Sequence, residues 1–209
     1  MQDLIILGAG PHAQEMADIV AQINRVQPTW NLLGSIVSPR QADLVGQTID
    51  NLVILATEAA IGQYPQACFA AEYGSDSSGC PRERLISLIA PSVFVARTAV
   101  IGAGCVIYPN CFVGHNARLG DRVFVLSSST INHDNVLEDN VSVTSHVSLA
   151  GYVHVETGCY LGQACTVRQY LRIGRDSLIG MGSVVLADVP PNSVMVGNPA
   201  RKLRDRNLV

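Results

Sequence analysis

An aliphatic residue returns at every sixth position of the chain from Ile89 to Val185, without a gap. The seventeen positions are Ile89, Val95, Ile101, Ile107, Val113, Leu119, Val125, Ile131, Leu137, Val143, Leu149, Val155, Leu161, Val167, Ile173, Ile179 and Val185. A helix has a period of about 3.6 and a lone strand alternates with a period of 2, so neither explains this pattern. A hexapeptide repeat that coils into a parallel β-helix does explain it.

A second register supports this interpretation. The fourth residue after each aliphatic is mostly small or β-branched, and cysteines stand there at Cys105, Cys111, Cys159 and Cys165. Three hexads make one triangular coil, so residues 18 apart in the sequence are expected to stack at the spacing of about 4.8 Å between strands. Glycine often follows the aliphatic, as at Gly114, and we expect it to provide a positive φ at a tight corner.

Residues 1–88 have a different pattern. Apolar runs predict strands at 4–7, 31–37, 52–56 and 85–89, with helices at 14–23 and 58–71. Alternating strands and helices predict a small parallel sheet of the Rossmann-like α/β class. The sequence therefore predicts two domains, an α/β domain over 1–88 and an all-β helix over 89–209.

Composition narrows the functional classes. The net charge of −3 and the aromatic content of 5% do not favour nucleic-acid binding, which needs a positively charged surface. No apolar run is long enough to span a membrane, and the first residues lack the basic segment of a signal peptide. We therefore expect a cytoplasmic protein without a membrane partner, whose inward cysteines are reduced core residues.

A glycine loop, Gly8-Ala9-Gly10-Pro11-His12, follows the first predicted strand. Backbone N–H groups at such a turn and at a helix N-terminus suit an anion, so a phosphate site is chemically reasonable. As a dinucleotide fingerprint the loop is weak, because Ala13 replaces the last glycine and the second predicted strand ends without an acid. A tight turn without a ligand remains an alternative, and His12 is expected to face a cleft.

The candidate catalytic pair is His133 with Asp134. A carboxylate partner fixes the tautomer of a histidine and raises its basicity, as a general base requires. His115 lies 18 residues earlier, so the two imidazoles should stack and point away from the prism. A solvated imidazole is one alternative. A metal held by His115 and His133 is another, although two ligands are fewer than the three protein ligands usual for catalytic zinc.

Three motifs carry a family resemblance. The chain combines Gly8-x-Gly10-x-His12 with a hexapeptide prism that contains the segment from His133 to Asp139, and the prism is followed by a closing motif made of the segments from Asp188 to Val194 and from Val196 to Arg201. It resembles the NeuD/PglD-type sugar O- and N-acyltransferases of the hexapeptide-repeat superfamily. The resemblance implies a left-handed β-helix, a homotrimer, acetyl-CoA as co-substrate in a groove between subunits, and an N-terminal domain that holds a sugar nucleotide. It implies no metal.

The same resemblance assigns roles to individual residues. His133 is the general base, Asp134 orients it, and the backbone N–H of Gly151 meets the oxyanion. The implied acyl-CoA-binding residues are Ser142, Gly151, Gln163, Met181, Asn198, Arg201 and Lys202. The implied substrate-binding residues are Gly8, Gly10, Pro11, His12 and Ser35. Four departures from the family concern the pockets: the segment from Gly34 to Ser38 stands where the family has an Asp pair, Pro11 replaces a glycine of the loop, Leu126 replaces an asparagine, and Ser142 replaces a second histidine. His146 lies four residues beyond Ser142 and is not assigned the role of that histidine.

Three functions from different classes follow. The first is acetyl transfer from acetyl-CoA to an amine or hydroxyl of a sugar. The second is a metal-dependent lyase or hydratase built on a trimeric β-helix. The third is a non-catalytic module in which the prism only trimerises. The sequence does not distinguish N-acylation from O-acylation.

Overall fold

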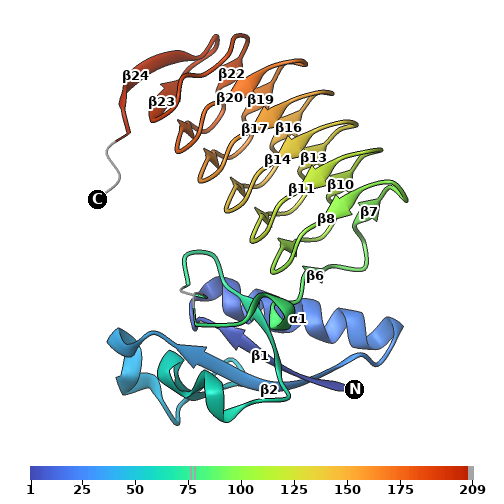
Figure 1. Ribbon diagram of the computed structural model, residues 1–209, viewed down its shortest axis with the longest axis vertical. Helices are drawn as coiled ribbons and strands as arrows, with labels where there is room; N and C mark the ends of the chain where they lie inside the picture. Colours follow the sequence, from blue (N-terminus) through green and yellow to red (C-terminus); the bar gives the residue numbers. More distant parts are fainter. Residues whose placement is uncertain (76, 78, 207–209) are drawn as a thin grey trace. The chain divides into compact units, whose positions relative to one another are not determined.

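The computed structural model describes residues 1–75, 77 and 79–206. The chain divides into two compact units, one made of Met1–Pro91 with Ala103–Val106 and the other of Ser92–Gly102 with Ile107–Val209. Each unit has its own architecture (Figure 1). No helix in the described part of the chain is long and apolar enough to cross a membrane.

The first unit is built on a five-stranded sheet with the order β3-β4-β2-β1-β5. Its strands are β1 (Gln2–Leu7), β2 (Trp30–Val37), β3 (Thr48–Ile49), β4 (Leu52–Thr57) and β5 (Cys68–Ala71). Strands β4, β2, β1 and β5 are parallel, and β3 pairs antiparallel with β4. The carboxyl ends of the four parallel strands therefore meet at one edge of the sheet, where ligands bind in open α/β sheets.

One α-helix, α1 (Pro11–Val26), follows β1. Its buried residues Ala13, Met16, Ile19 and Val20 recur at the three- and four-residue spacing of one helical face. Pro11 occupies the first turn, where its missing N–H removes no helical hydrogen bond. Short 3₁₀ helices lie at Pro39–Leu44, Glu58–Gln63 and Arg82–Arg84. With one α-helix among its described residues, the unit corresponds only loosely to a Rossmann-like domain.

The helix predicted over 58–71 is wrong. The segment begins with the 3₁₀ helix Glu58–Gln63 and ends as strand β5. Pro65 disfavours a helical conformation of the residue before it, which ends the helix. The apolar residues that follow are buried as an outer strand beside β1. The strand predicted over 85–89 is also shorter than expected, because β6 covers only Leu88–Ile89 and Leu85 makes an isolated bridge to Phe69.

The second unit is a parallel β-helix with three faces, as the hexad pattern predicts (Figure 1). Face 1 contains β7 (Phe94–Val95), β10 (Phe112–Val113), β13 (Thr130–Ile131), β16 (Ser148–Leu149), β19 (Thr166–Val167) and β22 (Val184–Val185). Face 2 contains β8 (Val100–Ile101), β11 (Arg118–Leu119), β14 (Val136–Leu137), β17 (His154–Val155) and β20 (Arg172–Ile173). Face 3 contains β6, β9 (Val106–Ile107), β12 (Phe124–Val125), β15 (Ser142–Val143), β18 (Tyr160–Leu161), β21 (Leu178–Ile179), β23 (Ser193–Val196) and β24 (Arg201–Asp205).

Neighbouring strands on each face pair residues 18 apart, such as Val113 with Ile131 and Ile131 with Leu149. The stacking predicted from the repeat is therefore confirmed, whereas the left hand of the coil stays a prediction. The last strand, β24, departs from the coil and pairs antiparallel with β23.

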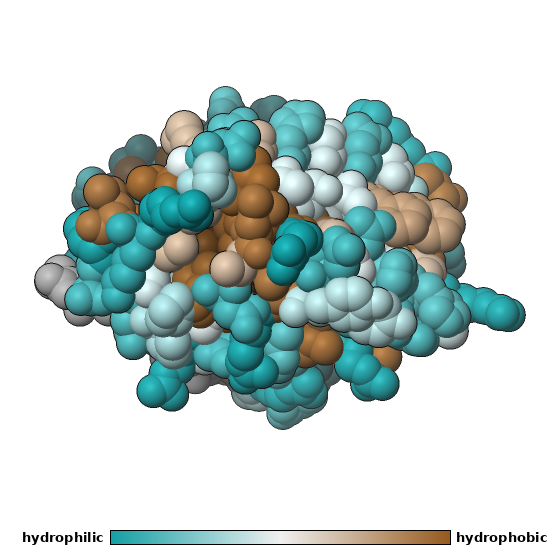
Figure 2. All heavy atoms as spheres, turned by 90° about the horizontal axis from the view of Figure 1, so that it is seen from above, coloured by the Kyte–Doolittle hydropathy of each residue, from teal (hydrophilic) through white to brown (hydrophobic). Residues whose placement is uncertain are grey.

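The aliphatic and small positions point inward and form the core. From Ile107 to Val185 each aliphatic position is at most 3% exposed. Cys105, Cys111, Cys159 and Cys165 are buried and free, as expected for core residues. Burial raises the pKa of Cys159 and of Cys165 to about 12, so these thiols are unreactive. Apolar surface is not confined to the interior, because Figure 2 shows hydrophobic residues exposed among hydrophilic ones on the face viewed from above.

At the corners of the coil, the residues with a positive φ are not the glycines that directly follow the aliphatic positions, contrary to expectation. Positive φ occurs three residues after the aliphatic, where asparagine and aspartate are frequent, as at Asn116 (56°) and Asp134 (58°). Gly114, directly after its aliphatic, does not have a positive φ. A Cβ on Gly114 would instead lie 2.7 Å from the backbone N of His133 in the next coil. Glycine is needed there because adjacent coils approach closely.

Candidate active site

His133 and Asp134 lie at the corner that joins face 1 to face 2, directly after β13. Nδ1 of His133 lies 2.9 Å from Oδ2 of Asp134, and the imidazole is about half exposed. An ionised carboxylate only accepts hydrogen bonds, so Nδ1 carries the hydrogen and Nε2 presents a lone pair. Among the described residues Nε2 has no hydrogen-bond partner, which leaves it available to accept a proton from a substrate.

Three residues hold the carboxylate of Asp134. The imidazole of His133, then the amide of Asn116 (Nδ2 to Oδ1, 3.1 Å), and more weakly the hydroxyl of Tyr152, lower the pKa of Asp134 from its ordinary value of 3.8. The carboxylate therefore remains charged at neutral pH and can stabilise an imidazolium. Asn116 and Tyr152 lie 18 residues before and after Asp134, at the equivalent position of the neighbouring coils. They are part of the site although the sequence reasoning did not select them.

Gly151 lies one coil beyond His133 at the same corner. A Cβ on Gly151 would be 2.5 Å from Cε1 and 2.7 Å from Nε2 of the imidazole. The imidazole thus lies directly over this glycine, and a side chain there would displace it. Within the described structure the Gly151 N–H makes no backbone hydrogen bond, whereas the N–H groups of Ala150 and Tyr152 do.

Two aromatic rings flank the imidazole. Tyr152 contacts His133 edge-on, with 5.3 Å between ring centroids, and stacks on Tyr170 at 5.0 Å. Both tyrosines have a positive φ, 60° and 63°. A bulky residue in this conformation is unusual and strained, and such strain often marks a functional site.

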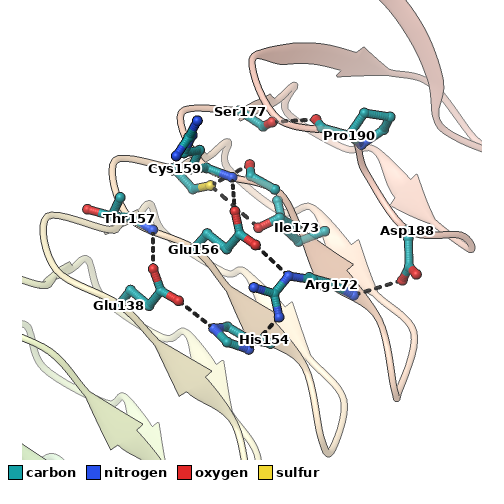
Figure 3. Close-up of polar contacts among 12 residues, drawn as sticks. Glu138, His154, Glu156, Thr157, Cys159, Arg172, Ile173, Ser177, Asp188 and Pro190 are labelled. Carbon is teal, nitrogen blue, oxygen red and sulfur yellow. Dashed lines mark hydrogen bonds and ion pairs between the residues drawn. The ribbon is translucent and has the colours of Figure 1, made fainter.

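A second histidine–carboxylate pair provides a comparison (Figure 3). Nε2 of His154 lies 2.7 Å from Glu138, and its Nδ1 lies 3.2 Å from Nη1 of Arg172, which can only donate. Glu156 pairs with Arg172 and accepts the Arg175 N–H. Both ring nitrogens of His154 are therefore occupied. His133 is therefore better suited than His154 to accept a proton. The hydrogen-bonded residues around His154 instead link successive coils on face 2.

The remaining histidines are placed as follows. Nδ1 of His115 lies 2.8 Å from the hydroxyl of Thr98, and His146 is exposed at another corner. Nδ1 of His12 lies 3.0 Å from Glu15 on α1. No group of three or more His, Cys, Asp or Glu residues suited to a metal ion occurs within residues 1–75, 77 and 79–206.

The predicted groove residues come together at a different corner, between face 3 and face 1. Gln163 and Met181 line a cavity of about 560 Å³, together with Thr144, Tyr160 and Val196. Ser142 lies on β15 and is buried between Phe124 and Tyr160, its register partners. Ser142 is therefore next to the groove in sequence, but it is not exposed in it.

The last three predicted acyl-CoA-binding residues, Asn198, Arg201 and Lys202, lie on and before β24. Arg201 pairs with Val196, which lines the groove, and Lys202 pairs with Met195. The Lys202 ammonium lies 2.6 Å from Asp205, so this lysine already has an anionic partner. Asn198 precedes Pro199 in the turn between the two strands.

The predicted substrate-binding residues are only partly together. Gly8 and Gly10 line a cavity of about 610 Å³ in the first unit. Ser35 is fully buried, and its hydroxyl donates to the Gly8 carbonyl at 2.6 Å, so it supports the loop instead of facing the cavity. Pro11 and His12 belong to the first turn of α1.

Comparisons with known proteins agree with this architecture. Residues 98–133 match the family of bacterial transferase hexapeptide repeats. The acetyltransferase domain of PglB from Neisseria gonorrhoeae FA1090 is similar over 97% of this chain and 100% of that chain, with a TM-score of 0.83 at 21% identity. The chain thus contains the hexapeptide repeat of bacterial transferases, in a fold that it shares with this acetyltransferase domain. A variant of GDP-perosamine N-acetyltransferase from Caulobacter crescentus, solved with CoA and GDP-perosamine, is similar over 98% of both chains, with a TM-score of 0.86 at 19% identity.

Sequence similarity to curated proteins is local. A putative acetyltransferase of Staphylococcus aureus (strain COL) is 42% identical over 55 residues, which are 26% of this chain and 28% of the relative. An acyl-[acyl-carrier-protein]–UDP-N-acetylglucosamine O-acyltransferase of Pseudomonas aeruginosa (strain LESB58) is 43% identical over 58 residues, which are 28% of this chain and 22% of the relative. The chain thus spans about a quarter of the length of the curated relatives that it matches.

Proposed function

We propose that the protein is an acetyl-CoA-dependent acyltransferase that acetylates an amine or hydroxyl of a sugar, with His133 as the general base. The observation that carries this proposal is the dyad itself. Nδ1 of His133 is bonded to Asp134, Nε2 is available, and the imidazole lies over Gly151. Solved relatives of the same fold contain acetyl-CoA, or CoA together with GDP-perosamine.

The residues act in one sequence of steps. Nε2 of His133 removes the proton from the acceptor amine or hydroxyl as it attacks the thioester carbonyl. The Asp134 carboxylate stabilises the imidazolium that forms. The Gly151 N–H, which makes no backbone hydrogen bond in the described structure, donates to the oxygen on which negative charge develops. His133 then returns the proton to the departing thiolate, so the base is regenerated.

The two parts of the proposed site, the dyad and the groove, lie at different corners of the prism, which favours an assembly of several copies. His133 and Gly151 occupy the corner between faces 1 and 2, whereas Gln163 and Met181 occupy the corner between faces 3 and 1. One prism cannot present both corners to the same thioester, but two copies side by side can. We propose a homotrimer in which the dyad of one copy meets the groove of the next, with Arg201 and Lys202 near the CoA phosphates.

A thiol-release assay with acetyl-CoA and a panel of amino sugars, free and nucleotide-linked, tests this function. His133→Ala should abolish acetyl transfer while the protein keeps its oligomeric state. His154→Ala is the matched control, since it removes the other carboxylate-paired imidazole of the prism and should leave turnover unchanged. Full activity of His133→Ala would exclude His133 as the base. A stoichiometric metal in the purified protein would favour the lyase or hydratase alternative, and absence of acetyl-CoA binding would favour the binding module.

A further inference from the structure

The glycine loop of the first unit is filled by a carboxylate of the same chain. Glu72 is the first residue after β5, which pairs with β1 through Ala71 and Leu7. The Gly10 N–H donates to Oε2 of Glu72 at 3.0 Å. A Cβ on Gly8 would lie 2.1 Å from Oε2, and one on Gly10 would lie 2.4 Å from Oε1. Both glycines are therefore required for this carboxylate to enter the loop.

The Glu72 carboxylate lies at the N-terminus of α1, a position that favours an anion. Gly10 caps the N-terminus of the 16-residue helix α1, where N–H groups and the helix dipole favour negative charge. Glu72 already provides that charge and already uses the Gly10 N–H. A phosphate entering the loop would have to displace Glu72 or lie beside a like charge.

The cavity around the loop has the chemistry of a site for hydroxyl and amine groups. It measures about 610 Å³ and lies at the carboxyl ends of the parallel strands. Among the described residues that line it, Glu58 and Glu72 provide carboxylates and Arg40 provides a guanidinium. The described part of the lining therefore does not offer the excess of positive charge that a diphosphate would need.

We propose that Glu72 is a specificity-determining residue that excludes phosphate from the glycine loop and accepts hydrogen bonds from a hydroxyl- or ammonium-bearing ligand. The identity of this ligand as the non-reacting part of the sugar acceptor rests on the proposed function. Carboxylates bind sugar hydroxyls readily, because each oxygen accepts more than one hydrogen bond. The cavity therefore selects a glycoside over a sugar phosphate.

Equilibrium titration of the full chain with two matched sugars tests the proposal. Methyl α-glucosaminide and glucosamine 1-phosphate differ only in the group at the anomeric oxygen. The wild-type protein should bind the methyl glycoside at least tenfold more tightly than the phosphate. Glu72→Gln keeps the side-chain shape and an oxygen for the Gly10 N–H but removes the charge, so the two affinities should then agree within about threefold.

Glu83→Gln is the matched control, because it removes an exposed carboxylate of the same unit and should leave the wild-type preference intact. Tighter binding of the phosphate by the wild-type protein, or an unchanged preference in Glu72→Gln, would overturn the proposal, as would failure of both sugars to bind. The wild-type preference decides the matter alone if the variant does not fold. The titration contains no acetyl-CoA and does not involve His133, so its failure is distinguishable from failure of the transferase proposal.

Discussion

The imidazole of His133 lies over Gly151, so close that a single methyl group on residue 151 would be 2.5 Å from its Cε1. These residues are 18 apart in the sequence and occupy adjacent coils, so the position of the imidazole depends on a glycine that it contacts only because the chain coils. The absence of a side chain at 151 is thus a condition for the geometry of the dyad.

Gly151→Ala should therefore impair acetyl transfer strongly. The new methyl group displaces the imidazole from its position, and a misplacement of about 1 Å can lower the rate by about 100-fold. The imidazole is half exposed and can rotate into solvent, so the thermal unfolding midpoint should change little. Steady-state kinetics and thermal unfolding check this. Gly62→Ala, where a Cβ meets nothing within 4 Å, should change neither quantity.

Asp134→Asn should reveal a pH-dependent contribution to stability. The pKa of Asp134 is lowered in the folded protein by His133 and Asn116, so its charge stabilises the fold at pH values above the ordinary pKa of 3.8. This contribution is lost as pH falls through the lower folded pKa. Asparagine tolerates the positive φ of residue 134, so the exchange adds no backbone strain.

The measurement is the unfolding midpoint of both proteins across pH. The wild-type protein should unfold at a higher temperature at neutral pH, and the difference should shrink once pH drops below about 4. A difference that stayed constant down to pH 2 would show that the charge of Asp134 does not contribute.

Tyr152→Asn should separate stability from activity. A non-glycine residue in the left-handed region is strained by about 1–2 kcal/mol, and asparagine relieves much of this. Loss of the stacking with Tyr170 offsets the gain by about 0.5–1.5 kcal/mol. The free energy of unfolding should therefore change by less than about 1 kcal/mol, whereas kcat should fall because the ring that contacts His133 is gone.

Tyr170→Asn is the control for this variant, because it relieves a similar φ of 63° and leaves the contact between Tyr152 and His133 in place. Denaturant unfolding and kcat of the two variants check the comparison. An equal decrease of kcat in both would argue that the stacked pair, and not the contact with the imidazole, matters.

Asn135→Ser should be neutral or stabilising. Asn135 is fully buried inside the prism; its Oδ1 accepts the Val153 N–H, but its Nδ2 has no partner among the described residues. An unpaired buried donor costs about 1–3 kcal/mol. Ser129, at the equivalent position one hexad earlier, both accepts the Val147 N–H and donates to the Thr144 carbonyl.

Serine at residue 135 should be satisfied in the same way. Denaturant unfolding should show that Asn135→Ser is at least as stable as the wild-type protein and about 1 kcal/mol more stable than Asn135→Ala, which lacks the acceptor. A serine variant less stable than the alanine variant would contradict this account.

The β-helix is predictable from the sequence because its six-residue period determines which residues share a face and which residues stack on one another. The six-residue spacing gives the faces, and the 18-residue spacing places Gly151 next to His133. The same arithmetic applied to Asp134 leads to Asn116 and Tyr152, so these partners were accessible from the sequence as well. The φ values of the corners were not, because the glycines directly after the aliphatic positions, such as Gly114, are needed for close approach of the coils and do not have a positive φ.

The first unit was harder to predict because its pattern is ambiguous. The run Cys68–Ala71 has no period of its own, and it could continue the preceding helical turn or begin a strand. Because the sequence pattern assigns this run to a helix, it does not show that Glu72 directly follows a strand beside β1. The sequence shows that no acid follows the second strand, whereas only the sheet order shows that Glu72 follows a strand that lies next to β1.

Because the coils stack at a constant spacing, lengths along the axis of the prism change in whole coils. Gln163 and Met181 occupy successive coils, so their separation along the axis is one step of about 4.8 Å. Adding or removing a block of 18 residues between His133 and β23 would change the reach of the groove by one such step and leave each corner intact. If the groove binds an elongated acyl donor, as proposed, the gain or loss of whole coils would change the donor length that fits in steps of about 4.8 Å, and the corner that carries His133 would stay the same.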